Sequence, residues 1–153
     1  MLQAAHNVSV PCFPAFARTS NTAEDNEGRQ IRIAAADLYR QGRLAEAEHL
    51  TRAALEHFPD SEDVLVIRAL ICEVRHDWAA AASALGHLLQ VQAEHAPAET
   101  CCHLVRVLRC DGQLTAAMQT ALHGLRLHPA HPALASELAQ LEALITSDQA
   151  KAA

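Results

Sequence analysis

Aromatic and β-branched residues are scarce in this chain of 153 residues. It contains one Trp, one Tyr and three Phe, and Val and Ile together number 13, against 32 Ala and 20 Leu. Strands favour the scarce residue types, whereas Ala and Leu favour helices. Gly and Pro are also few, five and six respectively, which leaves little punctuation for many turns. The composition therefore argues against a β-sheet protein and predicts an all-α fold.

Lysine is almost absent, because 11 of the 12 cationic residues are Arg, and 18 acidic residues give a net charge of −6. Without a basic run, we expect no nucleic-acid partner. No apolar run approaches the length of a membrane-spanning helix, so no membrane span is expected. The start of the chain has no cationic region, and Pro11 and Pro14 interrupt its apolar stretch, which argues against a secretory signal. Five cysteines without a framework spacing predict reduced thiols and a cytoplasmic location.

Three segments of the chain resemble one another. They cover residues 41–61, 75–95 and 111–131, and successive segments are offset by 34 and then 36 positions. Each has a large residue followed three positions later by a small one: Leu44 and Ala47, Trp78 and Ala81, Leu114 and Ala117. Pro59 and Pro129 close two of the segments, and Pro97 closes the middle one late. Self-similarity at so nearly constant a period indicates a repeat protein.

A second helical pattern precedes each of these segments, over residues 29–41, 62–74 and 98–110. Apolar or small residues recur there at the spacing of an amphipathic helix. Each repeat is therefore predicted to be a helix–turn–helix unit. Gly42 and Gly112 stand at the expected turns, where a helix end commonly needs a left-handed residue.

These repeats resemble the tetratricopeptide repeat over about residues 28–131. The first repeat carries the pattern best, at Ala35, Leu38, Gly42, Ala47, Ala54 and Pro59. Arg68, Val105 and Gly124 depart from the family pattern. The resemblance implies three helix–turn–helix repeats stacked as a right-handed α-solenoid, with small residues where the paired helices approach.

The predicted domain spans residues 28–146. Its repeats cover about 28–61, 62–97 and 98–131, and a capping helix follows at 132–146. That helix has an apolar stripe made of Leu134, Leu138, Leu141 and Ile145, and a solenoid needs such a cap to stay soluble. Residues 1–27 are expected to be a flexible segment, and residues 147–153 a flexible tail.

The cluster formed by Cys101, Cys102, His103 and Cys110 is a candidate metal or thiol site. Cys102 and Cys110 would lie about 12 Å apart along a helix, too far for one zinc ion that binds sulfur at about 2.3 Å. No phosphate loop, HExxH or GxSxG motif is present either. We therefore expect no metal, no cofactor and no enzyme, and a thiol or metal sensor is the weaker alternative. His128 and His131, on either side of Pro129, are interpreted as solvated turn residues.

In the resembling family, the first helix of each repeat lines a concave groove that holds a peptide. Carried onto this sequence, the groove residues are Arg29, Arg32, Ile33, Ala36, Tyr39, Arg40, Val66, Ile67, Leu70, Glu73, Cys102, His103, Arg106 and Arg109. An apolar middle between Arg clusters suits a protein partner with apolar anchors and acidic flanks. The alternative is that Val66, Ile67 and Leu70 only pack beneath a neighbouring helix.

The family's chaperone adaptors hold a C-terminal carboxylate with Lys, Asn and Arg, but here Ala36 and Ile67 stand at the Asn positions. We therefore do not expect that clamp. Size, charge and layout resemble the small type III secretion chaperones that hold a translocator or needle subunit. Many of those carry an N-terminal dimerisation helix, whereas this chain has Pro11 and Pro14 in its N-terminal segment, which is a departure from that pattern. A general scaffold for complex assembly is the alternative, and an Ala-rich helix surface allows a homodimer.

Overall fold

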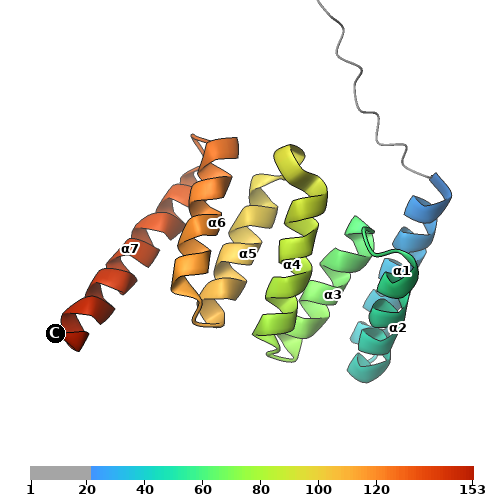
Figure 1. The fold of residues 1–153 in the computed structure, drawn as a ribbon. Helices are drawn as coiled ribbons and strands as arrows, with labels where there is room; N and C mark the ends of the chain where they lie inside the picture. The colour runs from blue at the N-terminus through green and yellow to red at the C-terminus, as the bar shows by residue number, and fades with distance from the viewer. Residues whose placement is uncertain (1–21) are drawn as a thin grey trace, which may run out of the picture.

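The computed structural model describes residues 22–153, which form helices joined by short turns (Figure 1). The helices are α1 (Thr22–Arg40), α2 (Leu44–His57), α3 (Glu62–Val74), α4 (Trp78–Gln92), the 3-10 turn η1 (Ala93–His95), α5 (Ala98–Cys110), α6 (Leu114–Leu127) and α7 (Pro132–Ala152). No strand occurs within this range. The predicted all-α fold is confirmed, and α3 and α5 span the predicted 62–74 and 98–110.

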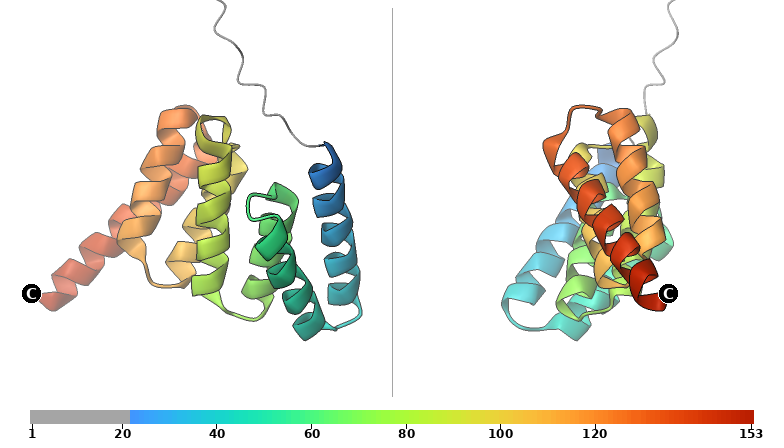
Figure 2. Two further views of the ribbon diagram at one scale, coloured as in Figure 1. Left: turned by 45° about the vertical axis from the view of Figure 1, so that its right-hand side comes forward. Right: turned by 90° about the vertical axis from the view of Figure 1, so that its left-hand side faces the viewer.

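The helices form an open row of pairs. α1 packs on α2, α3 on α4 and α5 on α6, and each pair contacts the next along the chain. Figures 1 and 2 show the pairs standing side by side, with α7 at the far end of the row. Because each pair touches only its neighbours, the domain is an α-solenoid and not a closed bundle.

The turn inside each pair uses a residue with positive φ. Gly42 and Gly112 have φ of 75° and 76°, and His76 takes the same place in the second repeat with φ of 57°. The backbone N–H of the next residue then donates to a carbonyl five residues earlier, at 2.9 Å in all three turns. This hydrogen bond satisfies a carbonyl that the helix end would leave unpaired. The repeated glycine was therefore a correct signal for the turn.

Local signals also account for where the helices begin. Ser61 Oγ accepts a hydrogen bond from the backbone N–H of Val64, and Asp77 does the same for Ala80. Such caps satisfy N–H groups that lack partners inside the helix. The second repeat closes late, as predicted. The turn η1 lies between α4 and Pro97, and Pro97 immediately precedes α5.

Alanines are buried between the paired helices. Ala35 and Ala47 in the first pair and Ala69 and Ala81 in the second are fully buried. Gly124, where the repeat pattern usually has Ala, contacts both α5 and α7. A Cβ at this position would lie 2.9 Å from Cys101 Cβ and from Leu134 Cδ1. Since that distance is shorter than carbon atoms tolerate, the packing of α6 against α5 and α7 favours glycine at this position.

The capping helix covers the last repeat as predicted. Leu134 and Leu141 are fully buried, and Leu138 packs against the main core. Most of the remaining α7 side chains are exposed. The apolar stripe therefore closes one end of the solenoid.

Two predicted boundaries move. α1 begins at Thr22, so residues 22–27 form helix and are not part of a flexible segment, and α7 continues to Ala152 instead of ending at 146. Glu24 and Asp25 in the first turn favour the start of α1 electrostatically, and Gly28 packs against Ser61. No Gly or Pro follows Pro132, so nothing local stops α7. Residues 1–21 lie outside the described part of the chain.

Replacing Gly42 with Ala tests the left-handed turn. An added Cβ would have no atom within 4 Å at Gly42 or at helical Gly86, so only backbone conformation differs. We expect Gly42→Ala to lower the free energy of unfolding by about 1 kcal/mol, and Gly86→Ala to raise it by about 0.5–1 kcal/mol. Chemical denaturation measures both. Equal effects of the two substitutions would contradict the turn assignment.

Candidate functional site

Large apolar side chains remain exposed on one face of α1 and α3. Ile33 and Tyr39 on α1 are 45% exposed, and Leu70 and Val74 on α3 are 44% and 43% exposed. The ends of the two helices enclose a cavity of about 320 Å³, which we call the α1–α3 cavity. Its lining residues are Tyr39, Ile67, Leu70, Ile71, Glu73 and Val74. Apolar surface gathered around a hollow is typical of binding sites.

The floor of the α1–α3 cavity is part of the core. Ile67 and Ile71 are 8% and 1% exposed and pack with buried Ala35 and Ala47. The exposed side chains therefore stand on a fixed base, because the helices beneath them pack through this buried cluster. A ligand would find this surface already formed.

Polar bridges join successive first helices of the repeats. Arg32 Nε lies 2.8 Å from Asp63 Oδ1 between α1 and α3, and the Glu73 carboxylate hydrogen-bonds the His103 ring between α3 and α5. Arg109 Nη1 lies 2.8 Å from Glu137 Oε2, which links α5 to α7. Each exposed ion pair stabilises little alone, but together these contacts connect the helices on which the predicted groove residues lie.

The predicted Arg clusters are partly used within the chain. Arg32 and Arg109 make the bridges just described, and Arg40 pairs with Asp37 on its own helix. Arg29 and Arg106 are exposed and make no ion pair with any residue from 22 to 153. The positive charge available to a ligand on this face is therefore smaller than the sequence suggested.

The remaining predicted groove residues divide between surface and core. Val66 is half-buried against the main core, Ala36 against the first-repeat cluster, and Cys102 against the α5–α7 junction. Ile67 is buried, as the packing alternative required, whereas Leu70 is exposed. The packing alternative therefore describes Ile67 and does not describe Leu70.

The sequence reasoning missed two residues that line the cavity, Ile71 and Val74. Val74 follows Arg40 by one repeat period, so the register of the repeats contained a signal for it. Ile71 carried no such signal, because it lies outside the positions that the resemblance marks as groove-facing.

The cysteines are poorly suited to a thiol or metal site. Burial raises the pKa of the Cys72, Cys101 and Cys102 thiols, which disfavours the thiolate that reacts and binds metal. Across residues 22–153, no three His, Cys, Asp or Glu side chains are placed to share a metal ion.

The two histidines near Pro129 have structural contacts. His128 is half-buried, and its Nε2 lies 2.8 Å from the carbonyl oxygen of Ala96. His131 Nδ1 accepts a hydrogen bond from the backbone N–H of Leu134 and so caps α7. The interpretation of both histidines as solvated turn residues was therefore wrong.

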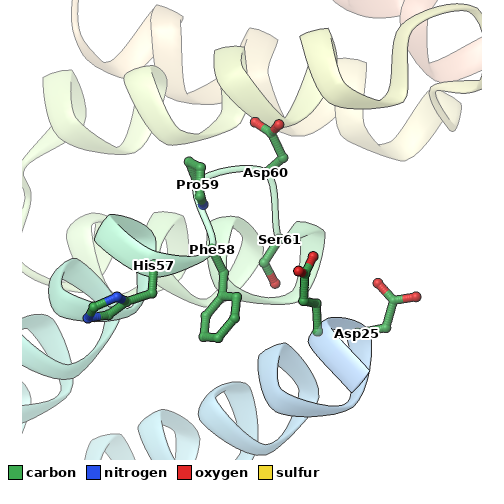
Figure 3. Close-up of a pocket in the computed structure, with 7 residues that line it drawn as sticks. Asp25, His57, Phe58, Pro59, Asp60 and Ser61 are labelled. Carbon is green, nitrogen blue, oxygen red and sulfur yellow. The ribbon is translucent and has the colours of Figure 1, made fainter. Parts of the chain in front are cut away.

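A second hollow lies where α1 begins (Figure 3). It measures about 280 Å³, and its lining residues are Glu24, Asp25, His57, Phe58, Pro59, Asp60 and Ser61. Figure 3 shows the Phe58 ring between the α2–α3 turn and the start of α1. Because residues from both helices line this hollow, the end of α2 lies next to the start of α1.

No family model and no curated protein matches the chain, but solved structures do. The first TPR domain of Spaghetti (RPAP3), bound to an HSP90 peptide, superposes with a TM-score of 0.65 at 14% identity over 80% of this chain and 95% of that one. The second TPR domain of human RPAP3, in complex with an HSP70 peptide, gives 0.62 at 12% identity over 79% and 97%.

A third similar structure is the C-terminal TPR-containing domain of a Plasmodium falciparum FK506-binding protein. It gives a TM-score of 0.60 at 11% identity over 86% of this chain and 97% of that one. At such identities the likeness shows the fold, and this chain has the fold of a tetratricopeptide-repeat domain. None of the helices described is both long and apolar enough to cross a bilayer.

Alkylation of the cysteines tests the thiol assignments. At about pH 8, a raised pKa leaves less thiolate, so iodoacetamide should modify exposed Cys110 first, Cys102 more slowly, and buried Cys72 and Cys101 only after unfolding. Peptide mass spectrometry measures each site, with protein unfolded in guanidinium as the control. If Cys101 or Cys102 reacted as fast as Cys110, the thiol-sensor alternative would regain support.

Proposed function

We propose that this chain is a non-enzymatic protein-binding module that holds a segment of a partner polypeptide against α1, α3 and α5. One apolar side chain of the partner occupies the α1–α3 cavity. The observation that carries this proposal is the exposure of Tyr39, Leu70 and Val74 around a hollow whose floor is rigid core.

The energetics favour an apolar anchor. Burying one Leu- or Phe-sized side chain contributes about 1.5–3 kcal/mol, and the cavity of about 320 Å³ has room for such a group. Ile67 and Ile71 are already packed, so binding does not have to order the floor. The contact would also cover the exposed Tyr39 and Leu70, which are otherwise left in water.

The similar structures support the class of function, since two RPAP3 domains of this fold were solved with peptides. The site chemistry here differs from a carboxylate clamp. Ile67 stands where that clamp needs Asn, and it is buried in the floor of the cavity. Apolar contact, rather than recognition of a chain terminus, therefore dominates the proposed binding.

Charge sets the flanks of the proposed ligand. Arg29 near one end of the face and Arg106 on α5 are exposed, and neither is paired within the described chain. Arg pairs well with carboxylates. A peptide with an apolar anchor between acidic residues would complement both features.

The finer role stays a prediction. The role of a cytoplasmic type III secretion chaperone for a translocator or needle subunit is supported by the size, charge and layout of the chain. It is not supported by any particular residue of the site. A general scaffold remains the alternative. Co-expression with a translocator or needle subunit separates the two, because a chaperone forms a stoichiometric complex with its substrate.

Leu70→Glu tests the cavity, and Leu122→Glu on α6 is its matched control, since the two leucines are 44% and 45% exposed. A peptide selected on the wild-type protein from a displayed library serves as ligand. We expect Leu70→Glu to weaken its binding by about tenfold or more, because a charge replaces the apolar contact. Leu122→Glu should leave binding unchanged.

Fluorescence anisotropy gives both affinities, and circular dichroism verifies that each variant is folded. If a folded Leu70→Glu protein bound as tightly as wild type, or if both variants lost binding equally, the cavity would not be the site.

Arg106→Gln tests the charged flank. For a selected peptide with acidic flanks, binding should weaken several-fold between about 50 and 200 mM salt, because exposed charges are screened. Arg106→Gln should reduce that salt dependence, whereas Arg126→Gln on α6 should not. Anisotropy titrations at each salt concentration measure it, and an unchanged slope for Arg106→Gln would remove this residue from the proposed site.

A further inference from the structure

The first 21 residues of the chain contain apolar side chains of the size that the α1–α3 cavity takes. Phe13 and Phe16 lie there, two of the three Phe in the protein, together with Val8 and Val10. The segment has no Asp or Glu and one Arg, whereas the whole chain carries a net charge of −6. It therefore offers the apolar anchors of the proposed external ligand without its acidic flanks, and its docking would rest on apolar contact alone.

Two prolines lower the conformational entropy that this peptide would lose on binding. Pro11 and Pro14 restrict φ to about −65° and donate no backbone hydrogen bond. A chain restricted in this way loses less conformational entropy when it becomes ordered. Phe13 and Phe16, on either side of Pro14, therefore suit insertion into a hollow better than they would on an unrestricted chain.

We infer that the segment around Phe13 and Phe16 docks in the α1–α3 cavity of its own chain, so that a partner must displace it. This inference rests on the proposed function, because it assigns the same cavity. It commits to an occupant within the chain, and docking into a second copy is an outcome that the test distinguishes.

The length of the chain allows the contact. Tyr39 follows Thr22 by 17 residues, which is about 26 Å along helix α1. Phe13 precedes Thr22 by nine residues and reaches about 30 Å when extended. If the segment runs back along α1, Phe13 can reach the cavity. Phe16 reaches about 20 Å, which brings it near exposed Ile33.

The attachment makes even a weak contact effective. Tethering makes docking an intramolecular event, and its effective concentration depends on how well the length of the connection matches the span to the cavity. An external peptide would bind the intact chain several-fold more weakly than a chain whose own segment is disabled.

Disulfide trapping in the full-length protein tests the docking, because native Cys12 adjoins Phe13. Cys102→Ser and Cys110→Ser remove the accessible competitors. Ala36→Cys then places a thiol on the groove face of α1, without changing a residue that lines the cavity. Glu56→Cys places one near the end of α2, on the exposed surface.

The Glu56→Cys control is demanding. His57 and Phe58 share a hollow with Glu24 and Asp25, so position 56 lies near the start of α1. An undocked segment attached at Thr22 would meet it more easily than it meets position 36. Docking predicts the opposite order.

Oxidation with glutathione disulfide, followed by peptide mapping of the monomer, gives the two rates. We expect the bond between Cys12 and the cysteine at position 36 to form roughly tenfold faster than the bond to position 56, and Phe13→Asp to abolish that preference. Equal rates, or faster bonding to position 56, would overturn the inference. Bonding to position 36 only between chains would assign the segment to a second copy and overturn it as well.

The selected peptide separates this inference from the proposed function. Phe13→Asp should raise the peptide's affinity several-fold, since the internal competitor is lost. If trapping fails while Leu70→Glu still abolishes peptide binding, the inference is wrong and the proposed function stands. If trapping succeeds while Leu70→Glu leaves peptide binding intact, the segment docks as inferred and the proposed external ligand binds elsewhere.

Discussion

The close contact between small residues at the helix crossings is the constraint on which the rest of the structure depends. Ala35 meets α2 and Ala69 meets α4 at fully buried positions. At these points a larger side chain would push the helices apart. Gly124 is a further case, because a methyl group there would lie 2.9 Å from Cys101 on α5 and from Leu134 on α7. These contacts set how each pair stacks on the next, and the stacking leaves one face of α1 and α3 uncovered.

The uncovered face combines a rigid base with exposed apolar side chains. Ile67 and Ile71 belong to the core, while Leu70, between them in sequence, projects from it. A helix can do this because Ile67 and Ile71, four positions apart, lie on one face, whereas Leu70 is turned by about 100° from Ile71. Packing of Ile67 and Ile71 into the core therefore leaves Leu70 44% exposed beside them.

The polar contacts across this face limit its charge. Asp63, Glu73 and Glu137 each contact a cationic or imidazole side chain on a neighbouring first helix. Charges neutralised in this way contribute less to attracting a ligand than free ones. Recognition on this face is therefore expected to rest mainly on shape and apolar contact, with Arg29 and Arg106 as the available positive charges.

The sequence by itself determined the repeat period, the helix pairs and the turns at Gly42 and Gly112. These features depend on residues close together in the chain, namely apolar spacing, caps and a left-handed residue. Even the late end of the second repeat was readable from Pro97.

Only the tertiary structure decided which side chains the face leaves available. Arg32 meets Asp63, and Arg109 meets Glu137, although a whole intervening helix separates the two members of each pair along the chain. Such distant partners leave no mark on local periodicity. The same holds for Ile67 and Leu70, which are both apolar and sit on one helix, because burial depends on how α1 and α2 pack against α3.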